Sequence, residues 1–224
     1  MSTAVIQPTN KVEVASPAQP VVKLRRRVVD LVLIGIGLLA AVVFTIAGAL
    51  LTWGNNFAGD YVHDELASQH ISFPTAESLQ EEGRGDLLKW ADHKVDTGKE
   101  AEAYASYIDG HLVGVADGAT YADLGTPERA AKADVQAAVQ AGKPQATVDE
   151  LQAKADAITN QRNTMFKGET LRGLLLSAYA WSTIGTIAGI AAVVAFGAAG
   201  VMFLLVILGV VHVARTPRTT PKTT

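Results

Sequence analysis

The 224-residue sequence contains no cysteine, and aromatic residues make up only 6% of it. The absence of cysteine excludes disulfides, thiolate zinc sites, iron–sulfur clusters and a cysteine nucleophile. The formal net charge of −3 gives the whole chain no basic surface, so we expect no nucleic-acid partner. Charge is also missing from two long stretches, and their apolar composition predicts where the protein resides.

The first uncharged stretch covers residues 31–53. As a helix it would measure about 35 Å, which exceeds the ~30 Å hydrocarbon core of a bilayer. A cleaved signal peptide is the alternative, because Ala47-Gly48-Ala49 offers a small-residue cleavage site. The run is longer than a usual signal-peptide core and many residues precede it, so we predict a transmembrane helix over residues 28–53.

The second uncharged stretch covers residues 173–213 and would form a helix of about 60 Å, twice the length that a bilayer needs. A hairpin of two spans would turn at residues 197–200, and residues 201–213 are too few for a second crossing. We therefore predict one span over residues 187–213. Residues 173–186 are more amphipathic and would continue outward as a helical stalk.

Charge predicts the orientation. Basic residues lie before the first apolar run and after the second: Lys23, Arg25, Arg26, Arg27, Arg215, Arg218 and Lys222. The segment between the runs, residues 54–172, holds 20 acidic and 11 basic residues. The positive-inside rule then places both termini in the cytoplasm and the acidic segment outside the plasma membrane.

The predicted fold is an all-α membrane protein in which two transmembrane helices bracket an extracytoplasmic helical domain. Its second helix extends outward as the stalk. The boundaries are residues 1–27 for a disordered cytoplasmic tail, 28–53 for transmembrane helix 1, 54–172 for the acidic extracytoplasmic domain, 173–186 for the juxtamembrane stalk, 187–213 for transmembrane helix 2 and 214–224 for a cytoplasmic tail.

The outer segment shows helical rather than strand periodicity. Apolar residues recur every three or four positions over residues 101–115, and Gly118 is a typical helix stop. Thr126-Pro127-Glu128 predicts a helix start, and Gly142 predicts the end of that helix. Thr147 and Glu150 match a capping box that would open the next helix.

Three further local predictions complete the outer segment. Residues 59–70 and 86–95 are expected to form two shorter helices, and residues 71–74 between them are expected to be extended because of Pro74. The helix that leads into the stalk is expected to break at Gly168.

No catalytic pattern is present in the sequence. His63, His70, His93, His111 and His212 do not form an HExxH motif, and the acidic pairs are adjacent residues that would face different ways on a helix. We therefore expect no enzyme activity, no catalytic or metal-binding residue and no cofactor. A membrane-bound metalloenzyme is the remote alternative, and it requires at least two outer histidines to converge with carboxylates.

Six residues near the second span are candidates for interaction. Glu169 and Arg172 are three residues apart and can pair on a helix, near the headgroups, where Arg172 would bind a lipid phosphate, bind a partner's carboxylate or act as an interfacial anchor. Tyr179 and Trp181 suit an interface or a docking surface. Gly185 and Gly189 form a GxxxG motif, which either packs on the first span or docks against a partner's helices.

A series of short motifs between about residues 60 and 186 carries a family resemblance. In order they are Val62-His63-Asp64, Ile71-Ser72-Phe73-Pro74, Val95-Asp96-Thr97-Gly98, Ala103-Tyr104-Ala105, His111-Leu112, Thr120-Tyr121 and the run from Phe166 to Leu176 that contains GETLRGLLL. This series resembles an uncharacterised actinobacterial family of small two-span membrane proteins. A related set carries an aromatic ring-opening dioxygenase label, for which this sequence has no ligand constellation. The resemblance implies a plasma membrane with its outer face toward the cell wall and implies no reaction.

The leading functional hypothesis is a non-enzymatic integral membrane protein. It would act as an accessory or assembly subunit that contacts a larger membrane complex through its outer domain and stalk, with the lipid bilayer and a membrane protein, or a second copy, as partners. The alternative is a membrane protein that binds a lipid or an envelope ligand. That alternative predicts an apolar groove lined by Ile108, Leu112 and residues 174–176, with Arg172 near the headgroup.

Overall fold

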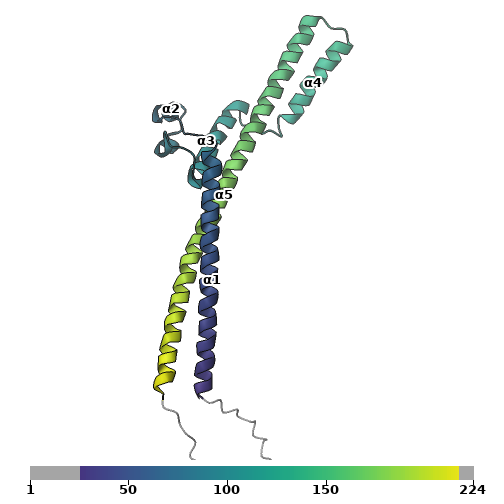
Figure 1. Cartoon of the computed structure of the whole chain (residues 1–224). Coiled ribbons are helices and arrows are strands. Elements are labelled where there is room, and N and C mark those ends of the chain that lie inside the picture. The colour runs from purple at the N-terminus through teal and green to yellow at the C-terminus, as the bar shows by residue number, and fades with distance from the viewer. Residues whose placement is uncertain (1–25, 217–224) are drawn as a thin grey trace, which may run out of the picture.

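The computed structural model describes residues 26–216, and within that range every regular element is helical. The elements are α1 (Arg26–Ala67), α2 (Ala76–Glu81), the 3-10 helix η1 (Gly85–Trp90), α3 (Gly98–Ala116), α4 (Gly125–Gln140) and α5 (Gln145–Arg215) (Figure 1). The predicted all-α class is therefore confirmed. Most of the two predicted tails, residues 1–25 and 217–224, lies outside the described residues.

Two long helices dominate the molecule. α1 has 42 residues and α5 has 71, which correspond to about 63 Å and about 106 Å. Each contains a stretch long and apolar enough to cross a membrane, and only 11% of that stretch in α1 and 17% in α5 is buried within the structure. The core helix of a soluble protein would be mostly buried, so these surfaces face something other than the protein itself.

α1 and α5 run antiparallel and pack side by side along one constant register (Figure 1). Gly37 of α1 faces Val206, Gly48 faces Phe196, and Ala58 faces Gly185. The same register places the charge-free residues 31–53 of α1 level with residues 190–212 of α5. The two apolar stretches thus form one slab of the molecule, and the rest of α5 extends beyond it.

One face of α5 is covered by other helices along most of its length. Its buried and half-buried positions recur every three or four residues between Leu151 and Val213. A mean spacing below 3.6 residues favours a left-handed crossing of the neighbouring helices. α4, α3 and α1 occupy successive parts of this face, so α5 is the spine of the molecule (Figure 1).

The break expected at Gly168 is absent, since α5 is continuous from Gln145 to Arg215. Gly168 instead lies directly against Leu112 of α3, where any added Cβ would overlap the leucine side chain. The glycine therefore serves a close approach between two helices. Its helix-weakening effect is small against the contacts that hold α3 and α5 together.

A compact module surrounds the C-terminal end of α1. It consists of the end of α1, α2, η1 and α3 together with the part of α5 around Leu175, and we call it the outer module. Its core brings α1, the connecting segments, α3 and α5 together in one cluster of buried residues: Val62, Leu66, Phe73, Leu79, Leu87, Val95, Ala101, Ala105 and Leu175. The Tyr104 ring meets Phe73 edge-on with 5.2 Å between ring centroids. Because α1 and α5 both contribute core residues, the module is fixed to the two long helices.

Several local predictions need correction. Residues 59–67 do not form a separate helix but the last turns of α1, because Val62 and Leu66 continue the buried face of that helix. Residues 26 and 27, assigned to the tail, are the first residues of α1. The helix expected over residues 86–95 is the 3-10 helix η1, which ends at Trp90.

Two predicted helix starts are also wrong in detail. The first residue of α5 is Gln145, preceded by Pro144, and Thr147 makes no capping bond. Leu124 precedes α4, and the Thr126 hydroxyl accepts a bond from Arg129 instead of capping the helix. The extended segment before Pro74 is confirmed by a single antiparallel bridge between Ser72 and Lys94.

Candidate interaction surface at the outer end of the apolar slab

The Glu169–Arg172 pair predicted from the sequence is present, and it has a third member. The Arg172 guanidinium lies 3.2 Å from Glu169 and its Nε lies 3.4 Å from Asp109 of α3. Arg172 therefore joins α3 to α5 across their interface. Its charge is balanced by two carboxylates, which leaves it poorly placed to hold the phosphate of a lipid headgroup.

Gly185 and Gly189 both face α1. A Cβ at Gly185 would lie 2.9 Å from the Ala58 Cβ, and one at Gly189 would lie 2.7 Å from the Asn55 side-chain oxygen. Small residues at such positions permit close approach of two helices. Of the two uses predicted for this GxxxG motif, packing between the chain's own long helices is the one seen at these positions.

Tyr179 and Trp181 have different surroundings, although both lie in the predicted stalk. The backbone of Tyr179 and the side chain of Ser182 press against Gly98 at the start of α3, where only a glycine fits. Trp181 exposes 49% of its surface and lines a groove. Tyr179 therefore belongs to the junction with the outer module, and Trp181 is the residue that a ligand can reach.

The groove lined by Trp181 lies between the end of α1 and the predicted stalk, and we call it the α1–α5 groove. It has a volume of about 330 Å³ and a mostly apolar wall made of Tyr61, Val62, Glu65, Leu66, Gln69, Ile71, Leu171, Leu174, Leu175, Ser177, Ala178 and Trp181. Leu66 and Leu175 form its buried floor, whereas Leu174 is 64% exposed at its rim. Glu65 is the one charged residue that lines it.

A second groove lies between α3 and α5, and we call it the α3–α5 groove. It has a volume of about 430 Å³ and is lined by Tyr107, Ile108, His111, Leu112, Val115, Thr164, Lys167, Gly168 and Leu171. Leu171 lines both grooves, so the two adjoin on α5. Of the apolar residues predicted to share one concavity, Ile108 and Leu112 line this groove and Leu174 and Leu175 line the α1–α5 groove, whereas Leu176 lines neither.

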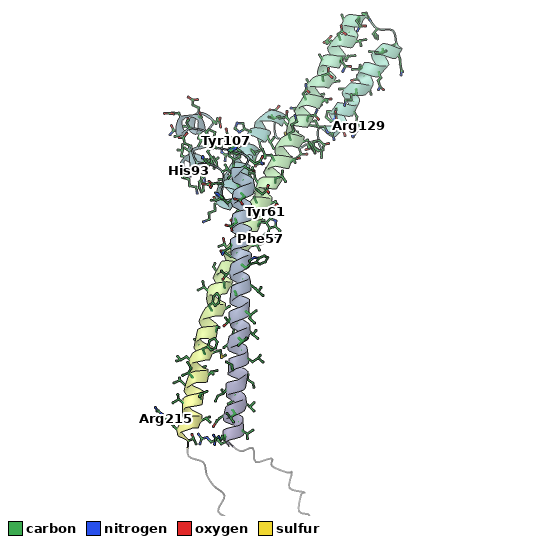
Figure 2. All side chains as sticks on the ribbon, viewed as in Figure 1. Phe57, Tyr61, His93, Tyr107, Arg129 and Arg215 are labelled. Carbon is green, nitrogen blue, oxygen red and sulfur yellow. The ribbon has the colours of Figure 1, made fainter. Side chains whose placement is uncertain are left out.

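Three aromatic rings on α1 lead from the apolar slab to the α1–α5 groove. Trp53 stacks on Phe57 with 5.6 Å between centroids, and Phe57 stacks on Tyr61 at 6.2 Å. All three are exposed, and Figure 2 shows Phe57 and Tyr61 just below the outer module. The ladder ends at Tyr61, which lines the groove.

The four outer histidines are dispersed over the outer module. His63 lies 3.2 Å from the Asp96 carbonyl oxygen, His93 lies 3.5 Å from Glu100, and His111 lies 3.9 Å from Glu82. Within residues 26–216, no group of three or more histidines and carboxylates is arranged to hold a metal ion. No family model, curated protein or solved structure matches the chain. Function is therefore inferred from the geometry of the described residues.

A buried carboxylate that the sequence did not single out fixes α4 to α5. Glu128 accepts bonds from Lys132 at 2.7 Å, from Thr159 at 3.0 Å and from Arg162 at 2.7 Å, and we call these four residues the Glu128 cluster. These hydrogen bonds lower the pKa of Glu128 to about 2. The Arg162 guanidinium also lies over the Tyr121 ring.

A capping box that the sequence analysis missed begins α3. Thr97 accepts a bond from the Glu100 backbone, and the Glu100 carboxylate accepts bonds from the Thr97 backbone and hydroxyl. Burial opposes ionisation of Glu100, but the hydrogen bonds from Thr97 and Asp96 outweigh it and lower the pKa of the carboxyl. The Thr-x-x-Glu spacing over residues 97–100 is visible in the sequence and could have located this helix start.

Proposed function

We propose that this chain is a plasma-membrane protein that crosses the bilayer twice, with both termini in the cytoplasm and residues 54–172 outside. It acts without catalysis, as an accessory or assembly subunit that contacts a larger membrane complex through its outer module and stalk. The family resemblance carried by the GETLRGLLL run belongs to the same proposal.

The register between α1 and α5 supports this placement. If residues 31–53 and 190–212 share one bilayer, the stalk lies level with the last residues of α1, 57–67, and the turn that follows them. That part of α1 carries Asp60, Asp64 and Glu65, which are costly in hydrocarbon. The stalk therefore belongs outside the bilayer although it contains no charged residue of its own.

The observation that carries the functional proposal is the unbroken helix α5. From residue 190 to its start at Gln145 it extends about 68 Å beyond the slab. The outer module packs against the middle of this arm, and α4 packs along its distal part (Figure 1). The Glu128 cluster joins α4 to that distal part. Such an arm holds a contact surface at a fixed distance from the membrane.

Exposed apolar residues on the arm supply that surface. Phe166 of α5 is 56% exposed and packs on Tyr121, and Val113 of α3 is 57% exposed. Both lie well outside the charge-free slab, where water would otherwise cover them. Burying them on another protein would contribute about 25 cal/mol per Å² of apolar surface.

Site-specific photo-crosslinking in living cells tests the proposal. A photoreactive amino acid at Phe166 should give one defined adduct with another membrane protein, and the same protein should co-purify in mild detergent. The matched control is the same amino acid at Lys154, an exposed position of α5 in the segment that pairs with α4, where no such adduct should form. Recovery of the chain alone, or only as its own oligomers, would contradict the accessory role.

A further inference from the structure

We infer that the two adjoining grooves form a binding site for one long-chain fatty acid, with its carboxylate at Lys167 and its chain running along α5 toward Trp181 and the membrane. The inference depends on the proposed membrane placement but not on a protein partner. It assigns a class of ligand to the two grooves, for which the accessory role gives no occupant.

The two grooves follow one another along the same side of α5, and we call this line of residues the track. Thr164, Lys167 and Leu171 line the α3–α5 groove, and Leu171, Leu174, Ser177 and Trp181 carry the same strip through the α1–α5 groove. From Lys167 to Trp181 the track covers 14 residues, which is about 21 Å along the helix. That distance matches an extended long hydrocarbon chain rather than a compact ligand.

The shape of the α1–α5 groove favours a single chain. Its volume of about 330 Å³ lies near the lower end of the ~300–1,000 Å³ found for small-molecule sites. Val62, Leu66 and Leu175 close its floor, so a chain in the groove would lie on buried apolar side chains.

The charges along the track fix the direction and the sign of the ligand. Lys167 is exposed and lines the α3–α5 groove, and it makes no ion pair within the described residues. Glu65 lines the other groove, so an anionic head is attracted to the Lys167 end and repelled from the Glu65 end. One ammonium group balances the single negative charge of one carboxylate.

The remaining polar groups of the α3–α5 groove are already engaged. The Tyr107 hydroxyl donates to Glu82 at 3.3 Å, and His111 lies 3.9 Å from the same carboxylate. Burial and the bond to Glu82 raise the pKa of Tyr107 to about 12, so this hydroxyl stays protonated. Glu82 is thus held on the α2 and α3 side of the groove, and Lys167 on α5 remains the group that a carboxylate can reach.

The aromatic ladder supplies the entry route. In the proposed placement Trp53 lies at the outer boundary of the bilayer and Tyr61 lies at the groove. A chain that leaves the outer leaflet along Trp53, Phe57 and Tyr61 would stay in contact with apolar rings. Aromatic side chains are suited to this boundary because their rings tolerate both surroundings.

The test uses the full chain in phosphatidylcholine vesicles that contain palmitic acid with a photoactivatable diazirine at its last carbon. In the bilayer that carbon lies at the midplane, level with Val42 and Met202 in the proposed placement. In the groove it lies near Tyr61 and Trp181. We expect labelling of residues 57–66 and 174–184, in addition to the midplane labels that any membrane span collects.

Matched variants separate site binding from general lipid contact. Lys167→Glu should reduce labelling of residues 174–184 about fivefold, since an exposed charge contributes up to about 1 kcal/mol. Lys154→Glu, an exposed lysine of the same helix outside both grooves, should leave it unchanged. Ser177→Trp should block the groove rim, whereas Ala180→Trp, exposed but outside the grooves, should not.

The outcomes distinguish the two proposals. Excess oleate should compete with the probe, and excess lysophosphatidylcholine, which has no net charge, should not. Midplane labels without groove labels would overturn the fatty-acid site and leave the membrane placement standing. Equal competition by lysophosphatidylcholine would overturn the anionic assignment. Absence of any label near Val42 and Met202 would instead contradict the placement itself.

Discussion

The two halves of α5 are held to their neighbours by different chemistry. The half inside the apolar slab packs on α1 through small residues, with Gly48 of α1 and Ala192 and Gly209 of α5 in the contact. The distal half packs on α4 around Glu128 and its three donors. We call the contact between α5 and α1 in the slab the slab seam, and the contact between α5 and α4 around Glu128 the distal seam.

The difference follows from the proposed surroundings of each half. In a bilayer, burying apolar surface gains little because lipid is as apolar as the side chains, so association depends on close van der Waals packing. In water, alanine residues such as Ala131 and Ala155 bury little area, and hydrogen bonds to a charged group add to their small contribution. Close packing therefore holds the helices together in the slab, and hydrogen bonds to a carboxylate add to the packing in the distal seam.

Enlarging a seam glycine should have the largest effect. Gly48→Leu would drive a side chain into Phe196, and overpacking of this kind costs about 1–3 kcal/mol. We expect a lower unfolding temperature of the full chain in detergent, measured by circular dichroism. The control is Gly197→Leu, because a side chain at Gly197 meets open space. Equal losses from both variants would show that the seam is not the cause.

Neutralising the carboxylate of the distal seam should have the next largest effect. Glu128→Gln keeps the shape of the side chain but removes the charge that Lys132 and Arg162 share. Amide hydrogen exchange over residues 125–140 should rise, while exchange in the slab stays constant. Asp134→Asn, which changes an exposed carboxylate of the same helix, serves as the control. Unchanged exchange in the Glu128 variant would remove the carboxylate from this account.

Acidification should weaken the distal seam. The pKa of Glu128 falls from its usual 4.5 to about 2 in the folded chain, so the folded state binds fewer protons than the unfolded state. The stabilisation is complete above about pH 4.5 and is lost as the pH falls through about 2. Hydrogen exchange of α4, corrected for the intrinsic pH effect, should show this window. Its persistence in Glu128→Gln would assign the dependence to another group.

A smaller effect should come from the cap of α3. Thr97→Ala removes the hydroxyl that caps this helix and should cost about 1 kcal/mol. Thr147→Ala changes the same residue type in the same sequence pattern, but Thr147 caps nothing and its loss should be silent. Thermal unfolding of the two variants compares them directly. A larger loss from the Thr147 variant would reverse the assignment of the two helix starts.

These two threonines show what the sequence can and cannot predict. Both are followed at the third position by glutamate, so the pattern alone cannot rank them. The helix after Pro144 begins three residues earlier than the pattern predicts, because the fixed φ of proline suits a helix start. The stops at Gly118 and Gly142 were predictable, since both adopt the positive φ that glycine tolerates.

Long-range contacts were the part that local patterns could not supply. The apolar runs predicted both long helices, and the three-residue spacing of Glu169 and Arg172 predicted their pair. Asp109, however, reaches Arg172 from another helix, and Glu128 meets Arg162 across a hairpin. Such contacts depend on how helices pack, which no short window of sequence records.

The most direct test of the membrane placement is cysteine labelling in intact cells, since the natural chain has no cysteine. Cells that express one of three single variants, Asn10→Cys, Ala130→Cys or Thr220→Cys, are treated with a membrane-impermeant maleimide. We predict that position 130 reacts at once, and that positions 10 and 220 react only after the membrane is permeabilised. Labelling of position 10 or 220 in intact cells, with position 130 protected, would contradict the account.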